Sequence, residues 1–340
     1  MKYKLTSFSI LEYGQRKDAQ GNPHQEDSLF PVHNQLSDDD RLFIVCDGMG
    51  GHDFGEVASA TVCEAMSKAI LEKTSETDFT DDILKEAIQQ AYDALDARDT
   101  DTGSAKKMGT TMTVLKLHQQ GATIAHIGDS RVYHIRPGKD AETTRILHVT
   151  KDHSLLNSLL DVGEITLEDI PNFKQKNVIT RAMQPQMERR SKADIYHTSD
   201  ILPGDYFYLC SDGMLENTSD DNLRFIFSAA IPEEKKKETL IEVTKNNKDN
   251  HSAIVVHILD VEEATQPTTS EPLMVVADEE KEKVPTAPTC PRCQNQSTNP
   301  VQRKSNHHLA LTIGVIVVIA ALLLAVIYFT NLFSLHAPAK

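Results

Sequence analysis

The chain has 340 residues, with 35 basic and 50 acidic side chains and a formal net charge of −15. This acidic balance argues against a general nucleic-acid-binding protein, which needs a basic face to displace counterions, so we expect no nucleic-acid partner. The five cysteines are odd in number and three lie within apolar segments, which favours a reducing compartment over a disulfide framework. The N-terminal residues carry no apolar core of a secretion signal.

The first third of the chain alternates short apolar runs with polar turns. The predicted strands are residues 5–11, 28–32 and 42–46. The polar loop between the first two ends in the adjacent carboxylates Glu26 and Asp27. After Asp47, three of the next four residues are glycines, which lets the backbone approach a ligand closely. Apolar residues then recur at helical spacing over 57–70 and 79–95, which predicts two amphipathic helices.

The middle of the chain is predicted to form mainly strands. Their tight connections favour antiparallel pairing. The strands are residues 109–117, 122–127, 131–135, 146–149, 193–198, 205–210 and 252–259. Helical patterns cover residues 152–161, 222–229 and 233–245, and the irregular segment 164–177 is a candidate surface flap. The predicted fold class is therefore α+β, with two antiparallel sheets and helices on the outside.

The composition changes after Asp260. Residues 261–308 are rich in Pro, Thr, Glu and Lys, which is typical of a flexible linker. Residues 309–330 are apolar and uncharged, and about 20 such residues span a bilayer, whereas buried core helices seldom run this long without a polar face. Basic residues precede this segment, and only Lys340 follows it in the short tail 331–340. We expect a single-pass anchor in the cytoplasmic membrane, with residues 1–260 in the cytoplasm and an extracytoplasmic tail.

Five acidic positions share one local pattern, a carboxylate at a strand end or turn beside Gly, Ser or Asn. They are Glu26-Asp27, Asp47-Gly48, Asp129-Ser130, Asp212-Gly213 and Asp249-Asn250. Any one of them is ordinary turn chemistry. Together they are expected to converge at one end of a sandwich, where they would repel one another unless they held cations. Oxygen ligands favour Mg²⁺ or Mn²⁺, and two such ions about 3.5–4 Å apart activate a bridging water for attack on a phosphoryl group.

Nine short motifs, in order, resemble the bacterial members of the metal-dependent type 2C Ser/Thr protein phosphatases. They are residues 25–28, 45–52, 55–59, 109–111, 128–131, 150–154, 179–182, 211–213 and 249–250. The resemblance implies a β-sandwich flanked on both sides by helix pairs. It also implies hydrolysis of phosphoserine and phosphothreonine on proteins by a water that bridges two Mn²⁺ or Mg²⁺ ions. The implied partners are phosphorylated proteins, including a Ser/Thr protein kinase and its substrates.

The same resemblance implies a role for each carboxylate. The ligands of one ion are Asp47, Asp212 and Asp249, and those of the other are Asp47, Glu26 and the Gly48 carbonyl. Asp27 orients metal-bound water without binding a metal itself. Asp129 matches the aspartate that, together with Asp212, holds a third and weaker ion in many bacterial members. Residues 155–177 match the mobile flap of the family.

Two positions depart from the family pattern. The arginine that grips the substrate phosphate is replaced by Asn22, and Arg16 in the same loop is the candidate for that contact. Met49 stands where animal members carry a proposed general acid. His52 is either a proton donor or a residue at the edge of the site, in which case metal-bound water supplies the proton.

Other interpretations remain open from the sequence. The absence of the usual arginine is compatible with a non-catalytic sensor that binds phosphoproteins on the same fold. A phosphorylated anti-anti-sigma factor is an alternative substrate. Cys290 and Cys293 form one CxxC pair in the linker, whereas a structural zinc site needs four ligands. His153 has a family match but no evident ligand role, so we predict a structural turn residue.

Overall fold

The computed structural model describes residues 1–262 except for residues 19, 51–53, 75–77, 100–107 and 176. His52, the linker from residue 263, the predicted membrane helix 309–330, the tail 331–340 and the Cys290–Cys293 pair all lie outside the described residues. Within the described part, no helix is both long enough and apolar enough to cross a membrane.

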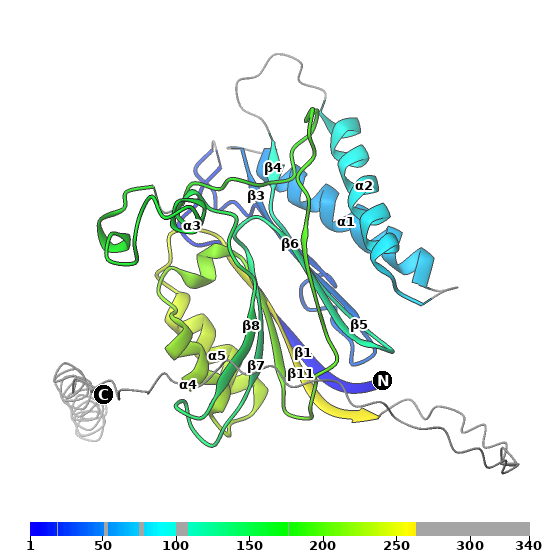
Figure 1. The fold of residues 1–340 in the computed structure, drawn as a ribbon, viewed down its shortest axis with the longest axis vertical. Coiled ribbons are helices and arrows are strands. Elements are labelled where there is room, and N and C mark those ends of the chain that lie inside the picture. The colour runs from blue at the N-terminus through cyan, green and yellow to red at the C-terminus, as the bar shows by residue number, and fades with distance from the viewer. Residues whose placement is uncertain (19, 51–53, 75–77, 100–107, 176, 263–340) are drawn as a thin grey trace, which may run out of the picture. The chain divides into compact units, whose positions relative to one another are not determined.

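Two antiparallel sheets form the centre of the fold (Figure 1). The first sheet has the strand order β1-β11-β10-β7-β8, and the second has the order β2-β3-β5-β6-β9 with β4 paired to β3. The strands of the first sheet are β1 (Lys2–Glu12), β7 (Arg131–Arg136), β8 (Arg145–Val149), β10 (Tyr206–Cys210) and β11 (His251–Glu262). Those of the second are β2 (Asp27–Phe30), β3 (Leu42–Met49), β4 (Gly109–Thr110), β5 (Met112–His118), β6 (Gly121–Ile127) and β9 (Asp194–Thr198).

Helices cover the outer faces of both sheets (Figure 1). The α-helices are α1 (Phe54–Thr74), α2 (Asp81–Arg98), α3 (Leu155–Asp161), α4 (Asp220–Ser228) and α5 (Glu233–Thr244). Two short 3₁₀ helices, η1 (Ile170–Asn172) and η2 (Asp212–Leu215), complete the described elements. The helices α1 and α2 pack on the second sheet, while α4 and α5 pack on the first. The predicted sandwich with flanking helix pairs is therefore confirmed.

Side-chain alternation along the central strands creates three apolar layers. In β3, Ile44 points to the layer shared with α1 and α2, whereas Phe43 and Val45 point to the layer between the sheets. In β10, Leu209 faces the layer between the sheets, and Tyr208 faces α4 and α5. Because successive side chains of a strand point to opposite faces, a slip by one residue would exchange these layers. The burial on both faces thus fixes the register of the strands that carry the acidic residues.

The strand ends bring the acidic turns to one end of the sandwich. Asp27 at the start of β2 lies directly across from Asp47 near the end of β3. The antiparallel strands β10 and β11 place the residue after Cys210 beside the start of β11, where Ser211 N–H donates to the Ser252 carbonyl at 3.0 Å. Asp212, which follows β10, and Asp249, which precedes β11, therefore lie at the same end of the sandwich.

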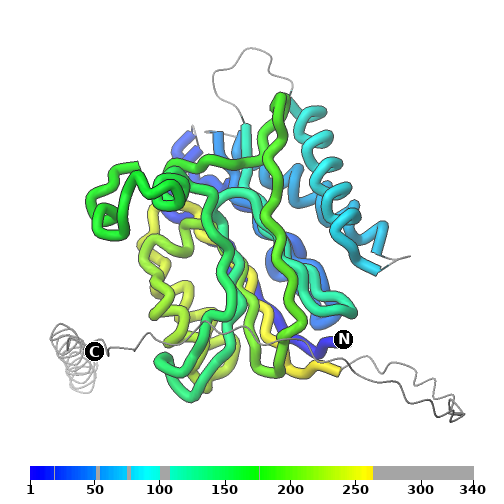
Figure 2. The backbone as a smooth tube through the Cα atoms, in the orientation of Figure 1, coloured from blue at the N-terminus to red at the C-terminus, as the bar shows by residue number. Residues whose placement is uncertain are grey.

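Residues 155–179, which contain the predicted flap and form the flap of the structure, project from the sandwich as a separate loop, drawn in green (Figure 2). Its base closes through a bridge between Ser154 and Ile179 and a 2.8 Å bond from Leu155 N–H to the Val178 carbonyl. No residue of α3 is buried, although four of its seven are leucines. The predicted helix over 152–161 begins only at Leu155, because Ser154 caps it by accepting a hydrogen bond from Asn157 N–H.

Candidate active site

Asp47 is held by hydrogen bonds at both ends of its backbone. Its N–H donates to Thr111 Oγ1 at 2.9 Å, and its carbonyl accepts from Thr111 N–H and from Thr110 Oγ1, each at 2.9 Å. Both threonines are completely buried. The main chain therefore fixes where the Asp47 carboxylate leaves the strand.

Asp27 is fixed through its side chain. Ser211 Oγ donates to Asp27 Oδ2 at 2.9 Å, and that hydroxyl in turn accepts from Ser252 N–H at 3.0 Å. Burial, together with repulsion from Asp212 and Asp249, raises the pKa of Asp27 to about 7 against the opposing hydrogen bond from Ser211. The two serines thus connect the edge strand β2 to β10 and β11 across the sandwich.

Glu26 lies beside Gly48 at very short range. Its N–H donates to Asn250 Oδ1 at 2.9 Å, and its carbonyl accepts from Gly48 N–H at 3.0 Å and from Ser59 Oγ at 2.6 Å. A Cβ atom on residue 48 would lie 2.1 Å from the Gly55 carbonyl oxygen and 2.5 Å from that of Glu26. Glycine at position 48 is therefore required for this close approach.

The five aspartates of the predicted cluster interact with one another. Burial first, and then the charges of the other four, raises the pKa of Asp47 well above its usual range. Burial and the charges of Asp212 and Asp152 raise the pKa of Asp129 to about 7. Burial followed by the charge of Asp249 raises the pKa of Asp212. The predicted convergence of the strand-end carboxylates is found in the structure.

Several oxygens of this cluster have no hydrogen-bond partner. Among the described residues, Oδ1 of Asp27, of Asp129 and of Asp212 is buried and receives no donor. A buried carboxylate oxygen without a partner is unfavourable, and repulsion within the cluster adds to that cost. Hard divalent cations, which bind oxygen ligands, would give these oxygens a partner and offset the repulsion between the carboxylates. The residues present thus fit Mn²⁺ or Mg²⁺.

Arg16 spans the two sides of the cluster. Its Nη1 contacts Glu26 Oε2, while Nε lies 2.6 Å from Asp249 Oδ1 and Nη2 lies 2.9 Å from Asp249 Oδ2. The side chain keeps 38 % of its surface exposed. The candidate arginine therefore reaches the site, whereas Asn22 closes an exposed turn by donating from Nδ2 to Asp18 Oδ2 at 3.0 Å.

His24 is a site residue that the sequence patterns did not predict. Its Nε2 lies 3.7 Å from Glu26 Oε1, and its Nδ1 lies 3.9 Å from Glu56 Oε2. The only sequence signal is its position two residues before Glu26, which places both side chains on one side of an extended segment. Ser211, Thr111 and Asn250 had no predicted role either. Ser211 binds the Asp27 carboxylate, whereas Thr111 and Asn250 hold the backbone N–H groups of Asp47 and Glu26.

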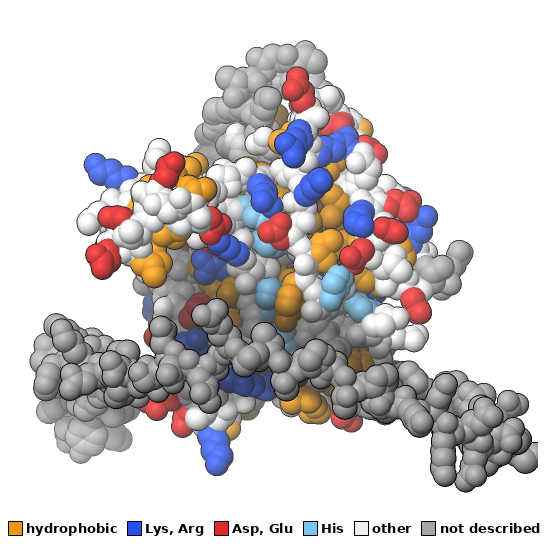
Figure 3. Space-filling view, in the orientation of Figure 1, with side chains coloured by type: hydrophobic (Ala, Val, Ile, Leu, Met, Phe, Trp, Pro, Cys, Tyr) orange, Lys and Arg blue, Asp and Glu red, His pale blue; other side chains and the backbone are white. Residues whose placement is uncertain are grey.

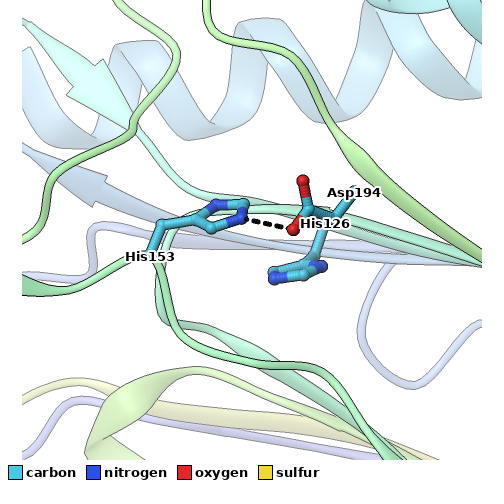
Figure 4. Close-up of side chains that lie close together, drawn as sticks. All are labelled: His126, His153 and Asp194. Carbon is cyan, nitrogen blue, oxygen red and sulfur yellow. Dashed lines mark ion pairs between the residues drawn. The ribbon is translucent and has the colours of Figure 1, made fainter. Parts of the chain in front are cut away.

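A second titratable cluster, formed by His126, His153 and Asp194, lies at the base of the flap (Figure 4). The ligand atoms of the three residues lie within 4.8 Å of one another. However, the two imidazole rings are stacked at 4.4 Å with an interplanar angle of 14°. Ring-nitrogen lone pairs lie in the ring plane, so stacked rings cannot aim them at one ion about 2 Å away. This cluster is a hydrogen-bonded group and not a metal site.

The protein phosphatase 2C family model matches residues 13–243. The chain belongs to the protein phosphatase 2C family. One similar relative of this phosphatase 2C chain is the protein phosphatase PhpP of Streptococcus pneumoniae serotype 2, which is 32% identical over 211 residues, or 60% of this chain and 80% of the relative.

Solved structures of the family resemble this protein phosphatase 2C chain as well. The Mycobacterium tuberculosis serine/threonine phosphatase PstP/Ppp has a TM-score of 0.59 and 28% identity, with 76% of this chain and 99% of that chain covered. The catalytic domain of PstP, described in complex with two manganese ions, has a TM-score of 0.57 and 28% identity over 75% of this chain and 99% of that chain. The chain is thus a metal-dependent serine/threonine protein phosphatase.

Proposed function

We propose that the carboxylate cluster holds two Mn²⁺ or Mg²⁺ ions and hydrolyses phosphoserine and phosphothreonine on proteins. The observation that carries this proposal is the set of buried carboxylate oxygens without partners around Asp47. The ligands of one ion would be Asp47, Asp212 and Asp249, and those of the other would be Asp47, Glu26 and the Gly48 carbonyl. Asp129 and Asp212 would hold a third, weaker ion.

When bound, the ions supply an activated water and neutralise charge on the phosphoryl group. The other tasks belong to side chains of this protein. Asp27, held by Ser211, would accept a hydrogen bond from the attacking water and orient it. Arg16 has a planar, partly exposed guanidinium group, which would bind two phosphate oxygens at once on leaving Glu26 and Asp249. No side-chain nucleophile is needed, and Met49 leaves proton transfer to water.

The assay uses the full chain and a phosphothreonine peptide. Chelation by EDTA should remove hydrolysis, and added Mn²⁺ should restore it in proportion to the ion bound in calorimetry. In the same assay, Arg16→Ala should raise KM for the peptide about 10- to 100-fold, since a charged hydrogen-bonding group is lost at the phosphate. Full activity in EDTA, or an unchanged KM in the variant, would contradict the proposal.

The proposed partners are phosphorylated proteins, among them a Ser/Thr protein kinase and its substrates. The same assay, supplied with an autophosphorylated kinase domain or with a phosphorylated anti-anti-sigma factor, distinguishes the two substrate classes. We expect faster hydrolysis of the kinase phosphothreonine. The position of Arg16 beside the cluster disfavours the non-catalytic sensor, because Arg16 would supply the cation that Asn22 does not.

We also propose that residues 309–330 anchor the enzyme in the cytoplasmic membrane with the phosphatase domain inside. The uncharged apolar composition of this segment and the basic residues before it support the proposal. Protease added outside intact spheroplasts should leave residues 1–308 uncut, whereas permeabilised cells should lose them. Digestion of the phosphatase domain in intact spheroplasts would refute this topology.

A further inference from the structure

His153 binds both backbone polar groups of Gly128, the residue before Asp129. The His153 N–H donates to the Gly128 carbonyl at 2.9 Å, and His153 Nδ1 accepts from Gly128 N–H at 3.1 Å. Gly128 has φ +111, and a Cβ there would lie 2.6 Å from Thr111 Cγ2. One residue from a distant segment therefore holds a turn that only glycine adopts without strain.

The same turn is connected to Asp47. Ser130 Oγ lies 2.7 Å from Thr111 Oγ1, the atom that accepts the Asp47 N–H. Any displacement of the turn from Gly128 to Ser130 thus acts on a hydrogen bond that positions Asp47. Through these contacts His153 is linked to the turns that carry Asp129 and Asp47, although it contacts neither carboxylate.

On its other side, His153 closes the base of the flap. Its carbonyl accepts from Thr180 N–H at 2.7 Å, and its Nε2 lies 3.2 Å from Asp194 Oδ2. Arg181, which follows the flap directly after Thr180, donates from Nη1 to Asp194 Oδ1 at 2.8 Å, and the same Nη1 lies 3.1 Å from His153 Nε2. His126 stacks on the ring, and its Nε2 lies 2.9 Å from the Lys151 carbonyl. Figure 3 shows histidine side chains reaching the surface of this face of the molecule.

The contact with Gly128 selects one tautomer of His153. Because Nδ1 accepts the Gly128 N–H, a neutral ring carries its proton on Nε2, which lies 3.2 Å from Asp194 Oδ2 and 3.1 Å from Arg181 Nη1. Burial lowers the pKa of His153, which favours that neutral ring near pH 7. The ring therefore has a defined direction, with an acceptor toward the metal-site turn and a donor toward the flap base.

We propose that His153 is a positioning residue that joins the base of the flap to the Gly128–Asp129 turn, so that the attachment of the flap sets the place of the Asp129 carboxylate. A protein that displaces the flap on binding then moves Asp129 through His153. The kinetic test of this inference rests on the proposed phosphatase function, whereas the hydrogen-exchange test does not.

Two variants separate the two sides of the ring. His153→Asn places an amide oxygen near the Nδ1 position, so it keeps the acceptor for Gly128 N–H and loses the contact to Asp194. His153→Gln reaches the Nε2 position, so it keeps the contact to Asp194 and loses that acceptor. In the metal-free protein, NMR hydrogen exchange of the Gly128 amide should be about tenfold faster in His153→Gln and near wild type in His153→Asn.

The kinetic arm uses Mn²⁺ and a phosphothreonine peptide. His153→Gln should lower the apparent affinity for Mn²⁺ about 10- to 100-fold and leave KM for the peptide within about twofold, as loss of an outer positioning contact does at metal sites. An effect on KM alone, or an equal effect of the two variants on Mn²⁺ affinity, overturns the inference. Absence of hydrolysis by the wild-type protein would instead overturn the proposed function, while the exchange measurement would still test His153.

A measurement on the wild-type protein removes any dependence on how the variants fold. Imidazole ¹⁵N spectra of the metal-free protein should show His153 with an unprotonated Nδ1 and a protonated Nε2, and with coupling across the bond from Gly128 N–H. A ring protonated at Nδ1, or unchanged Gly128 exchange in His153→Gln, overturns the proposal.

Discussion

Asp47→Asn should reduce hydrolysis of a phosphothreonine peptide by roughly a thousandfold or more, since several kcal/mol of metal-derived charge stabilisation depends on this ligand. The metal-free variant should nevertheless be at least as stable as the wild type. Burial and four neighbouring carboxylates act against the Asp47 charge, and asparagine removes that charge with almost no change of volume. The backbone bonds to Thr111 are unaffected by the change.

Three measurements check this result: kcat/KM with saturating Mn²⁺, Mn²⁺ binding by calorimetry, and Tm in EDTA. Asp39→Asn is the matched control, because it makes the same chemical change at an exposed turn and should leave all three values unchanged. Activity within tenfold of wild type would sink the bridging role of Asp47. A lower Tm in EDTA would show that the cluster is not under repulsion.

Gly48→Ala should disrupt the site through sterics alone. The new Cβ would lie 2.1 Å from the Gly55 carbonyl oxygen and 2.5 Å from the Glu26 carbonyl oxygen, and backbone atoms cannot move aside as a flexible side chain does. We expect a loss of about 1–3 kcal/mol in the free energy of unfolding. Because Glu26 must shift, Mn²⁺ binding should fall together with stability.

Gly204→Ala serves as the control for loss of a glycine. Gly204 has φ +95, and a Cβ there would meet nothing within 4 Å, so alanine introduces backbone strain without a clash. Its stability should fall by about 1–2 kcal/mol, with Mn²⁺ binding retained. If Gly48→Ala binds Mn²⁺ as well as Gly204→Ala does, the close approach at Gly48 does not position Glu26.

The convergence of the acidic residues could be predicted from sequence because each follows or precedes a strand with clear apolar patterning. The ends of neighbouring antiparallel strands meet, so Asp212 and Asp249 converge as soon as β10 and β11 pair. Asp27 and Asp47 were expected at the same end, but their direct cross-strand pairing depends on the register of β2 and β3. The local sequence pattern was sufficient to predict that the carboxylates cluster, but it did not predict which of them pair across neighbouring strands.

Most contacts that support the site could not be predicted, because they join segments far apart in the chain. Arg16 was a predicted candidate, but its pairing with Asp249 across 233 positions was not predicted, and neither was the contact of Ser211 with Asp27 across 184. No local spacing encodes such a pair. The late start of α3 also involves distant contacts, since His153, directly before the capping residue Ser154, is held by Gly128 and Thr180.

The contacts of Arg16 have a consequence for how the enzyme is loaded. Its guanidinium pairs with Glu26 and Asp249, so an ion that binds these proposed ligands would compete with a tethered cation and exchange with it. The occupancy of the site by Mn²⁺ would then depend on how much more strongly the carboxylates bind Mn²⁺ than Arg16. The apparent Mn²⁺ affinity would be lower than that of the same carboxylates without Arg16. Because the ion binds the folded state, the thermal stability of the domain should rise with the logarithm of the free Mn²⁺ concentration.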